Sequence, residues 1–508
     1  MLRLVLTLDG VLAILEGAVR RVLYPYSSSH PESFDIADLA YDSRRVTPGS
    51  LFFCLRGRRD DGHRYGPEAV EEGAVALACE RPLEVAVPQV LVSDTRAAMN
   101  KLAAAFFGHP SRRLRLVGVT GTNGKTTTAY LLESMLSAAG ERAGLVGTVE
   151  TRWPGPRGVT AESARTTPES VDLQRILSKM VSSGVTSCAV EVTSIGLAQG
   201  RVEGTFFEVA TFTNLTQDHL DYHETIDSYY RAKRSLFTPE RTRRALVNLD
   251  DPWGARLCSE TEVETLTFGI DSRAELRAEE VERSAKGSRF RAVGAGLDLE
   301  LEVPMPGAFN VSNVLAAAGA AALLGARPEA IADGVTLLAA RGGVPGRFEP
   351  VDRGQEFSVI VDYAHTPDGL ANVLRAARET CPRGDGRVIV VFGCGGDRDR
   401  AKRPLMGKIA AKGADLVFVT SDNPRSEDPL EIIAEIEGGL ARARPALSYR
   451  LIPDRAAAIG AAVSEARPGD VVVVAGKGHE SYQELGGRRI PFDDRVVATE
   501  ALERGRGR

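Results

Sequence analysis

The stretch Thr120-Gly-Thr-Asn-Gly-Lys-Thr-Thr-Thr128 follows the apolar run Leu114–Val119. This pattern predicts a strand, then a glycine-rich turn, then a helix that begins at Lys125. Glycines let backbone N–H groups approach a phosphate, and the helix N-terminus adds favourable partial charge. Lys125 can then reach the β- and γ-phosphates, while the Thr126 hydroxyl can hold Mg²⁺. The stretch predicts an ATP site made by Gly121, Thr122, Asn123, Gly124, Lys125, Thr126 and Thr127.

The spacing of this loop differs from the common form. Gly118 lies six residues before Gly124, whereas GxxxxGK[ST] requires five. A simple glycine turn is the alternative. The expected strand before the loop and helix after it favour phosphate binding.

Length and composition limit the classes of protein to which the chain can belong. A chain of 508 residues is too long for one core, so about three domains are expected. A hydrophobic content of 43%, a charged content of 26% and a net charge of −5 give no nucleic-acid or membrane signature. Met1–Leu15 is apolar but contains Asp9, which favours a strand and helix over a signal peptide. The six scattered cysteines form no Cys-x-x-Cys, which suits reduced thiols in the cytoplasm.

Strands and helices alternate along most of the chain. This alternation predicts an α/β protein with mostly parallel sheets and helices on both faces. We expect a small N-terminal α/β domain over 1–112, a central phosphate-loop ATPase domain over 113–340 and a C-terminal Rossmann-like domain over 341–508. Strands are expected near 51–55, 75–79, 114–119, 187–192, 209–214, 264–270, 288–293, 297–303, 357–362, 387–393, 415–420 and 470–475. Helices are expected near 67–72, 125–139, 169–182, 309–324, 327–339, 367–380, 402–412, 429–442 and 454–466.

Polar side chains follow two expected strands of the central domain. Glu191 ends Cys188-Ala-Val-Glu, and His219 lies in Thr213-Asn-Leu-Thr-Gln-Asp-His-Leu-Asp-Tyr-His. A carboxylate and an imidazole after neighbouring strands of a phosphate-loop domain could bind Mg²⁺. Taken singly, Glu191 is more often a cap or surface acid, and His219 a hydrogen-bonded loop residue.

Four polar turns follow apolar strands of the C-terminal domain. They are Asp362-Tyr-Ala-His-Thr-Pro, Phe392-Gly-Cys-Gly-Gly-Asp-Arg-Asp-Arg, Asp422-Asn-Pro-Arg and Gly476-Lys-Gly-His-Glu. Ligands of such sheets collect at the carboxyl ends of strands, so these turns predict a polar ligand. Arg398 and Arg425 could each bind a carboxylate through two hydrogen bonds. A purely structural role for each arginine is the alternative.

Lysine is scarce, which makes each lysine informative. The chain has nine lysines among 63 basic residues. Lys125, Lys233 and Lys477 all lie in the dense polar motifs, although chance retention of any one of them is possible.

Taken together, these motifs resemble the Mur ligase family, the ATP-dependent amino-acid ligases of peptidoglycan synthesis. The resemblance rests on the phosphate loop, the Thr213–His223 motif, Gly307-Ala-Phe-Asn-Val-Ser-Asn, Asp362–Asp368 and Asp422–Arg425, in that order. It implies addition of meso-diaminopimelate to the D-glutamate of UDP-N-acetylmuramoyl-L-alanyl-D-glutamate, with ATP consumed through an acyl phosphate. It also implies a cytoplasmic, monomeric enzyme with small-molecule substrates and Mg²⁺, without a nucleic-acid partner or membrane insertion.

The resemblance also implies roles for individual residues. Ser43 would contact the uridine end, and the muramoyl-dipeptide would be held by Thr166, Thr167, Thr193, Gln199 and Arg201. Thr126 and Glu191 would bind one Mg²⁺, and Glu191, His219 and Lys233 a second. Asn310 would meet the adenine, with Arg347 and Asp362 completing the nucleotide site. The diaminopimelate would contact Arg398, Asp422, Asn423, Pro424, Arg425, Gly476 and Glu480.

Lys233 is expected to carry a carbamate (N6-carboxylysine), because an ammonium beside Mg²⁺ would repel the metal. A plain ammonium that pairs with a phosphate or carboxylate is the alternative. The chain departs from the family at Ile195, where a histidine is usual, and in the uridine-side loop 57–63, which lacks the usual His-Gln-Ala-Asp.

Other readings remain open. An L-lysine-adding relative and a folylpolyglutamate synthase share the fold class. A phosphate-loop switch or transport ATPase and a non-catalytic muropeptide sensor belong to other classes. The 112 residues before the phosphate loop argue against the folate enzyme, and Asp422–Arg425 would be unnecessary in a switch.

Overall fold

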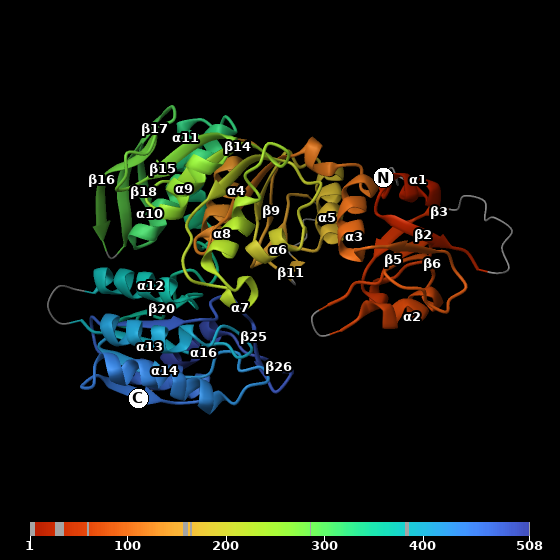
Figure 1. The fold of residues 1–508 in the computed structure, drawn as a ribbon. Coiled ribbons are helices and arrows are strands. Elements are labelled where there is room, and N and C mark those ends of the chain that lie inside the picture. Colours follow the sequence, from red (N-terminus) through yellow and green to blue (C-terminus); the bar gives the residue numbers. More distant parts are fainter. Residues whose placement is uncertain are drawn as a thin grey trace. The chain divides into compact units, whose positions relative to one another are not determined.

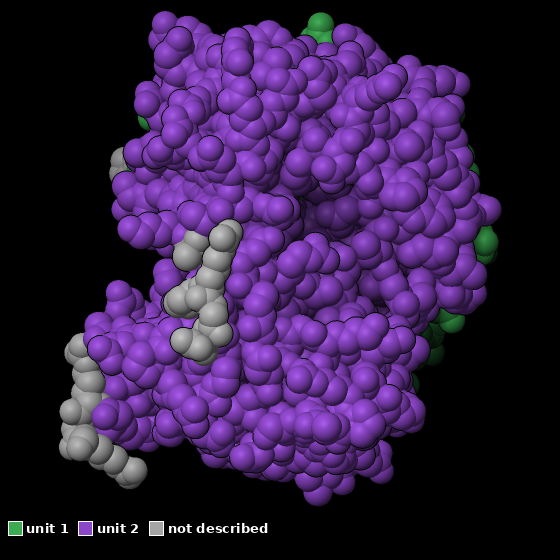
Figure 2. All heavy atoms as spheres, turned by 90° about the vertical axis from the view of Figure 1, so that its left-hand side faces the viewer, with its two compact units in different colours: residues 1–118, 142–208, 235–243 green, residues 119–141, 209–234, 244–508 purple. Residues whose placement is uncertain are grey.

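The computed structural model describes residues 6–25, 35–57, 60–155, 161–162, 165–284, 286–381 and 386–506. These fall into two compact units, coloured separately in Figure 2. Unit 1 comprises residues 1–118, 142–208 and 235–243, and unit 2 comprises 119–141, 209–234 and 244–508. The division passes through strand β8 (Arg115–Thr120), which begins in unit 1 and ends in unit 2.

The N-terminal part of unit 1 is a five-stranded sheet in the order β2-β7-β6-β5-β4. Strands β4 to β7 pair in parallel, and β2 runs antiparallel to β7 at one edge. Apolar side chains on one face pack against α1 and α3, and those on the other pack against α2. The elements are β1 (Leu6–Thr7), α1 (Leu8–Ile14), β2 (Val19–Leu23), β3 (Asp35–Ile36), β4 (Asp38–Ala40), β5 (Ser50–Phe53), α2 (Gly66–Glu71), β6 (Ala74–Cys79), β7 (Gln89–Val92) and α3 (Thr95–Phe106).

The rest of unit 1 contains strand β12 (Ser187–Glu191) and the segments before and after it. This strand pairs in parallel with β9 (Ala143–Val146), and β10 (Glu150–Arg152) and β11 (Ala161–Glu162) continue the sheet antiparallel. Helix α5 (Ser170–Ser182) buries Val171, Leu173, Leu177 and Met180, which recur at helical spacing. The short helix α6 (Ser194–Ala198) begins just after β12, with Thr193 as its N-cap.

Unit 2 begins with the end of β8 and helix α4 (Lys125–Ala138), which packs against α10 (Ala308–Leu323) and α11 (Pro328–Ala340). The close approach of α4 and α11 requires Gly334, because a Cβ there would lie 2.4 Å from Met135 Cα. The other elements of this part are β13 (Phe207–Phe212), α7 (Leu220–His223), α8 (Ile226–Arg234), β14 (Thr242–Asn248), α9 (Pro252–Glu260), β15 (Glu264–Gly269), β16 (Leu276–Ser284), β17 (Gly287–Gly294) and β18 (Leu297–Val303).

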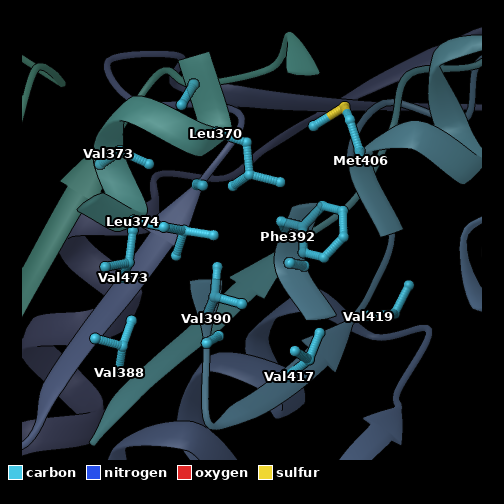
Figure 3. Packing of buried hydrophobic residues seen from close by; sticks show 14 of the residues in the cluster. Leu370, Val373, Leu374, Val388, Val390, Phe392, Met406, Val417, Val419 and Val473 are labelled. Carbon is cyan, nitrogen blue, oxygen red and sulfur yellow. The ribbon is translucent and has the colours of Figure 1, made fainter. Parts of the chain in front are cut away.

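The C-terminal part of unit 2 is a six-stranded sheet in the order β19-β20-β24-β21-β22-β23. All strands are parallel except β19, which lies antiparallel at the edge. Figure 3 shows the packing of one face, where Phe392, Val390 and Val473 meet Leu370, Leu374 and Met406. Helices α12, α13 and α14 cover this face, and α15 and α16 cover the other.

The elements of this part lie in the alternating order that the sequence predicts, and Figure 1 labels most of them. They are β19 (Glu349–Pro350), β20 (Ser358–Asp362), α12 (Pro367–Thr380), β21 (Val388–Phe392), α13 (Lys402–Gly413), β22 (Leu416–Val419), α14 (Pro429–Ala443), β23 (Ser448–Leu451), α15 (Arg455–Glu465), β24 (Val471–Ala475), β25 (Tyr482–Leu485), β26 (Arg488–Pro491) and α16 (Asp494–Arg506).

The predicted α/β class is confirmed, and each expected strand and helix has a counterpart within a few residues. Several elements were not predicted, among them α3, α8, α9, β14, β16, β23, the β25–β26 pair and α16. The division into three domains at 112 and 340 remains a prediction. All six cysteines are free, as expected. Within the described ranges, none of the helices has the length and apolar character needed to span a membrane.

Candidate active site

The phosphate loop lies between the end of β8 at Thr120 and the start of α4 at Lys125. Gly121 and Gly124 both have positive φ, at 153° and 87°. A Cβ on Gly121 would lie 1.9 Å from Thr213 Oγ1, and one on Gly124 would lie 2.3 Å from Asn313 Oδ1. The two glycines are therefore required by close packing as well as by backbone conformation.

The segment after β13 holds this loop in place. Thr213 Oγ1 donates to the Asn123 carbonyl at 2.6 Å, and Asn123 N donates to Asn214 Oδ1 at 2.9 Å. Thr122 N donates to the Asn214 carbonyl at 2.9 Å. The loop conformation is thus set by residues some ninety positions away in the sequence, not by the loop alone.

Two lysines meet at one carbonyl of the loop. Lys125 Nζ donates to the Gly121 carbonyl at 2.9 Å, and Lys233 Nζ, from α8, donates to the same oxygen at 2.7 Å. Lys233 is 1% exposed, and its Nζ lies 4.6 Å from the centre of the Tyr229 ring. Burial and the nearby Lys125 charge lower the pKa of the Lys233 amine well below its usual value. A neutral amine, or one balanced by an anion, suits this position.

His219 lies at the N-terminus of α7 in a left-handed conformation, with φ 54°. Burial lowers the pKa of this imidazole, although the Asp218 carboxylate 3.4 Å from Nε2 opposes the shift. Burial would raise the pKa of Asp218 itself, but His219, His365 and Lys402 outweigh it and lower the pKa to about 2. An ionised carboxylate therefore stands beside a neutral imidazole near neutral pH.

Arg347 connects the phosphate loop to the strand-end turn after β20. Its Nη2 donates to Thr126 Oγ1 at 3.0 Å, and its guanidinium lies 4.2 Å from the centre of the Tyr363 ring. Its Nη1 is buried and has no hydrogen-bond partner among the described atoms. A buried N–H of a cation without a partner marks a place where an anion would be stabilised.

The predicted nucleotide site also includes Asp362, Asn123 and Asn310. Asp362 accepts hydrogen bonds from Phe348 N at 2.7 Å and Ala364 N at 2.8 Å, and burial raises its pKa. Asn123 Nδ2 donates to Asp368 Oδ2 at 2.8 Å. Asn310 is buried and donates to the Pro306 carbonyl at 2.8 Å. Asp362 therefore shapes the Arg347 segment through its backbone.

The turns after β22 and β24 meet around Asn423. Its Nδ2 donates to Glu480 Oε2 at 2.8 Å, and its Oδ1 accepts from Lys477 Nζ at 3.2 Å. Lys477 is fully buried and forms an ion pair with Glu480 at 2.8 Å. Gly476 has φ 120°, and a Cβ there would lie 2.7 Å from Asp422 Oδ2. The structure thus brings together Asp422, Asn423, Gly476 and Glu480, as the sequence predicts.

Arg398 and Arg425 lie close enough to affect each other. Arg425 has φ 56°, and its Nη1 donates to the Gly396 carbonyl at 2.7 Å while Nε lies 3.5 Å from Glu484. Burial and the Arg425 charge lower the pKa of Arg398. Two neighbouring guanidinium groups favour an anionic ligand such as a carboxylate.

The predicted muramoyl-dipeptide residues form a connected network in unit 1. Thr167 Oγ1 donates to the Glu191 carbonyl at 2.9 Å and accepts from Thr193 N at 2.9 Å. Arg201 Nη1 donates to the Thr167 carbonyl at 2.9 Å, and its Nη2 donates to Gln199 Oε1 at 2.6 Å. These contacts bring four of the five predicted residues next to the end of β12.

Glu191 is fully buried at the end of that strand. Its Oε1 accepts from Thr148 N and its Oε2 from Thr148 Oγ1, both at 2.8 Å. Thr148 Oγ1 also lies within hydrogen-bond distance of Thr166 Oγ1, at 3.1 Å. A Cβ on Gly147 would lie 2.3 Å from Glu191 Oε1, so only glycine leaves room for this carboxylate.

Ser43 lies in the 3-10 helix Ser43–Arg45. Tyr41 and Arg45, on either side of it, both contact Asp172 of α5. In the uridine-side loop, His63 is buried, and its Nδ1 lies 2.6 Å from Asp61 Oδ1. Arg58 and Arg59 of that loop lie outside the described residues.

Known protein families match most of this chain. Three family models match it: "Mur ligase family, catalytic domain" over residues 35–107, "Mur ligase middle domain" over 119–321 and "Mur ligase, glutamate ligase domain" over 346–478. A curated UDP-N-acetylmuramoyl-L-alanyl-D-glutamate–2,6-diaminopimelate ligase of Geobacillus thermodenitrificans is 48% identical over 93% of this chain and 96% of its own. Its counterpart from Solibacter usitatus is 48% identical over 92% and 94%. The chain belongs to the Mur ligase family.

Solved structures agree with this membership. A structure described as a UDP-N-acetylmuramoyl-L-alanyl-D-glutamate–2,6-diaminopimelate ligase has a TM-score of 0.64 at 34% identity and covers 93% of this Mur ligase and 96% of its own chain. The MurF ligase of Thermotoga maritima, solved with ADP, has a TM-score of 0.63 at 19% identity over 92% and 97%. The folylpolyglutamate synthase of Mycobacterium tuberculosis, solved with ADP and AMPPCP, has a TM-score of 0.61 at 18% identity over 82% and 95%. The last two likenesses show the fold alone.

Sequence reasoning missed two groups in this Mur ligase. Lys477 stood out by its rarity, but only the structure shows its contacts with Asn423 and Glu480. Glu169 is 2% exposed and pairs with Arg96 at 2.6 Å, with Arg201 at 3.3 Å and with Arg165. No local pattern links these three arginines, because they lie on separate segments.

Over the described residues, no group of three His, Cys, Asp or Glu side chains could hold a metal ion. The predicted Mg²⁺ ligands include a threonine hydroxyl and a lysine, which such a group would not contain. Thr126, His219 and Lys233 belong to unit 2, and Glu191 belongs to unit 1.

Proposed function

We propose that this Mur ligase adds meso-diaminopimelate to the D-glutamate of UDP-N-acetylmuramoyl-L-alanyl-D-glutamate and converts ATP to ADP and phosphate. The observation that carries the proposal is the near-full-length match, at 48% identity, to relatives that bear this activity in their names. The product is a peptidoglycan precursor, and the enzyme works in the cytoplasm as a monomer on small molecules, without nucleic acid or membrane insertion.

The residues around the phosphate loop support ATP as the energy source. The N-terminus of α4 and Lys125 supply positive charge for the β- and γ-phosphates. Among the described atoms the buried Nη1 of Arg347 has no hydrogen-bond partner, so it can donate to a phosphate oxygen near the Thr126 hydroxyl. Asn310 would lie against the adenine, and Asp362 would hold the Arg347 segment.

The second predicted Mg²⁺ site suits the ion only if Lys233 is modified. Mg²⁺ prefers oxygen ligands, which Thr126 and Glu191 offer. Lys233 offers an amine, which is a poor ligand. Reaction of a neutral lysine amine with CO₂ releases one proton and gives a carbamate, which is an oxygen-donor anion. Thr126 and Glu191 would then hold one ion, and Glu191, His219 and Lys233 a second. Bound Mg²⁺ neutralises charge on the transferring phosphoryl group.

The reaction has two steps. A carboxylate oxygen of D-glutamate forms a bond to the γ-phosphorus of ATP, and the bond to ADP breaks. The amine of diaminopimelate then attacks the acyl phosphate, loses a proton and expels inorganic phosphate from a tetrahedral intermediate. Positioning and charge stabilisation dominate such chemistry, so the side chains bind and orient more than they react.

The muramoyl-dipeptide and diaminopimelate would bind to residues from different parts of the chain. Thr166, Thr167, Thr193, Gln199 and Arg201 would hold the muramoyl-dipeptide, and Ser43 the uridine end. Diaminopimelate carries a second carboxylate and a second ammonium. Arg398 and Arg425 would bind its carboxylates, while Asp422, Asn423, Pro424, Gly476 and Glu480 would surround an ammonium.

The L-lysine-adding activity is the second candidate, and one assay separates the two. Phosphate release is measured with ATP and UDP-N-acetylmuramoyl-L-alanyl-D-glutamate in the presence of meso-diaminopimelate, L-lysine or no amine. We expect fast release with diaminopimelate alone. Equal rates with both amines, or a rate that does not depend on an amine, would refute the proposal. A control with folate and L-glutamate tests the folylpolyglutamate synthase alternative, and we expect no release.

A further inference from the structure

A buried ion pair lies beneath the residues proposed to bind the amino acid. Arg455, the first residue of α15, and Asp494, the first residue of α16, both have side chains that are 0% exposed. Arg455 Nε and Nη2 donate to the two carboxylate oxygens of Asp494, each at 2.7 Å. This bidentate pair fixes the plane of the guanidinium.

The remaining donors of Arg455 reach two strand-end carbonyls. Nη2 donates to the Ala475 carbonyl at 3.0 Å, and Nη1 donates to the Ser421 carbonyl at 3.4 Å. Ala475 directly precedes Gly476, and Ser421 directly precedes Asp422. One side chain therefore links the starts of both turns that carry the predicted diaminopimelate contacts.

Asp494 connects this link to a third segment. It follows the β25–β26 hairpin, whose Gln483 Nε2 donates to the Asp422 carbonyl at 2.7 Å. Glu484 N from the same hairpin donates to Asn423 Oδ1 at 2.9 Å. The pair thus joins the turn after β22, the turn after β24 and the base of the hairpin.

The pair also acts on the charge of the turn. Burial would raise the pKa of Asp422, but Lys477 and Arg455 outweigh it and hold the pKa below its usual value. Asp422 therefore stays ionised beside Gly476, where its Oδ2 would be 2.7 Å from an added Cβ.

We propose that Arg455 and Asp494 are positioning residues for the incoming amino acid, which hold the turns at Asp422 and Gly476 in one fixed relation. Neither residue touches the reacting atoms. The inference rests on the proposed function, because it assigns these turns to diaminopimelate. A buried ion pair is seldom needed for stability alone, since apolar residues of similar size often replace one without loss.

The test uses that property of buried pairs. The double variant Arg455→Met/Asp494→Leu fills the site with apolar groups and removes both carbonyl contacts. The single variant Asp494→Asn keeps the shape and removes one charge, in case the double variant fails to fold. We expect the KM for diaminopimelate to rise about tenfold, which corresponds to loss of one hydrogen bond with a charged donor. The KM values for ATP and the UDP-muramoyl-dipeptide should stay within about twofold, as they involve other turns.

Arg387 and Asp470 provide a matched control at the opposite ends of the same strands. They form an ion pair at 2.6 Å next to the starts of β21 and β24. Asp470→Asn should lower the melting temperature without a selective change in any KM. The inference is overturned if the wild type uses diaminopimelate but the Arg455 and Asp494 variants leave its KM unchanged, or raise all three KM values together. A wild type that releases no phosphate with diaminopimelate overturns the proposed function and this inference with it.

Discussion

Arg425 is expected to decide between diaminopimelate and L-lysine. Its backbone is left-handed, with φ 56°, so the strand-end turn fixes where the side chain begins. Its Nη1 is bonded to the Gly396 carbonyl, and its Nε lies 3.5 Å from Glu484. These contacts use part of the guanidinium and brace it, and Arg398 beside it adds a second positive charge. L-Lysine lacks the distal carboxylate that would balance this charge.

The magnitude follows from the cost of leaving a charged donor unpaired. A buried hydrogen bond to a charged group contributes about 1.5–3 kcal/mol, so we expect roughly ten- to hundredfold discrimination between the two amines. Arg425→Ala should lower kcat/KM for diaminopimelate by that factor and leave the low value for L-lysine nearly unchanged. Arg425→Lys keeps the charge but not the two-pronged geometry, so it should recover only part of the preference.

The assay is phosphate release at varied amine concentration with ATP and the UDP-muramoyl-dipeptide saturating. Arg444→Ala is the matched control, because Arg444 also donates to a backbone carbonyl, that of Ala414, but is outside the strand-end turns. Both alanine variants should unfold at similar temperatures. If Arg425→Ala keeps the full preference for diaminopimelate, the side chain only braces its turn and the assignment is wrong.

Three other predictions concern the phosphate loop and its neighbours. Lys125→Ala should abolish ATP turnover and keep the fold, while Lys286→Ala, an exposed lysine, should be neutral; near wild-type phosphate release by the first variant would contradict the role. Lys233→Arg should be inactive, because arginine cannot form a carbamate. Mass spectrometry of the native wild type should show about 44 Da of added mass, which is the mass of one CO₂. Full activity of Lys233→Arg in CO₂-depleted buffer would contradict the carbamate. Burial lowers the pKa of His365 to about 4, so between pH 6.5 and pH 4 the unfolded state binds more protons than the folded one, and stability decreases as the pH is lowered through this range. His365→Gln should therefore reduce the drop in melting temperature from pH 7 to pH 5. An unchanged drop would show that other groups cause it.

The parts of the fold that the sequence predicts are those with strong local patterns. β24 is a run of valines that is buried on both faces, and α12 alternates apolar and polar residues at helical spacing. β16 was not predicted, because its sequence Leu-Arg-Ala-Glu-Glu-Val-Glu-Arg-Ser is mostly charged. It forms a strand because β17 pairs with it over most of its length. Tertiary pairing overrides the weak local preference in that case.

The candidate site divides in the same way. Gly121 and Lys125 could be predicted because the phosphate loop is a continuous motif. Arg347 could be placed at the nucleotide only through the family resemblance, because its contact with Thr126 joins residues 221 positions apart.

Lys477 and Arg455 show why contacts of this kind escape a reading of the sequence. Each makes bonds that depend on the strand order β20-β24-β21-β22, which sets the turns after β22 and β24 at the same edge of the sheet although some fifty residues separate them. A lysine with an ion pair three residues away, at Glu480, would look like a local surface contact. Its complete burial beside Asn423 instead makes it part of the same polar cluster as the predicted diaminopimelate residues. Residues that hold two turns in place relative to each other therefore belong to no local sequence motif. Their contacts are made with a segment that is distant in the sequence, so only the fold shows them.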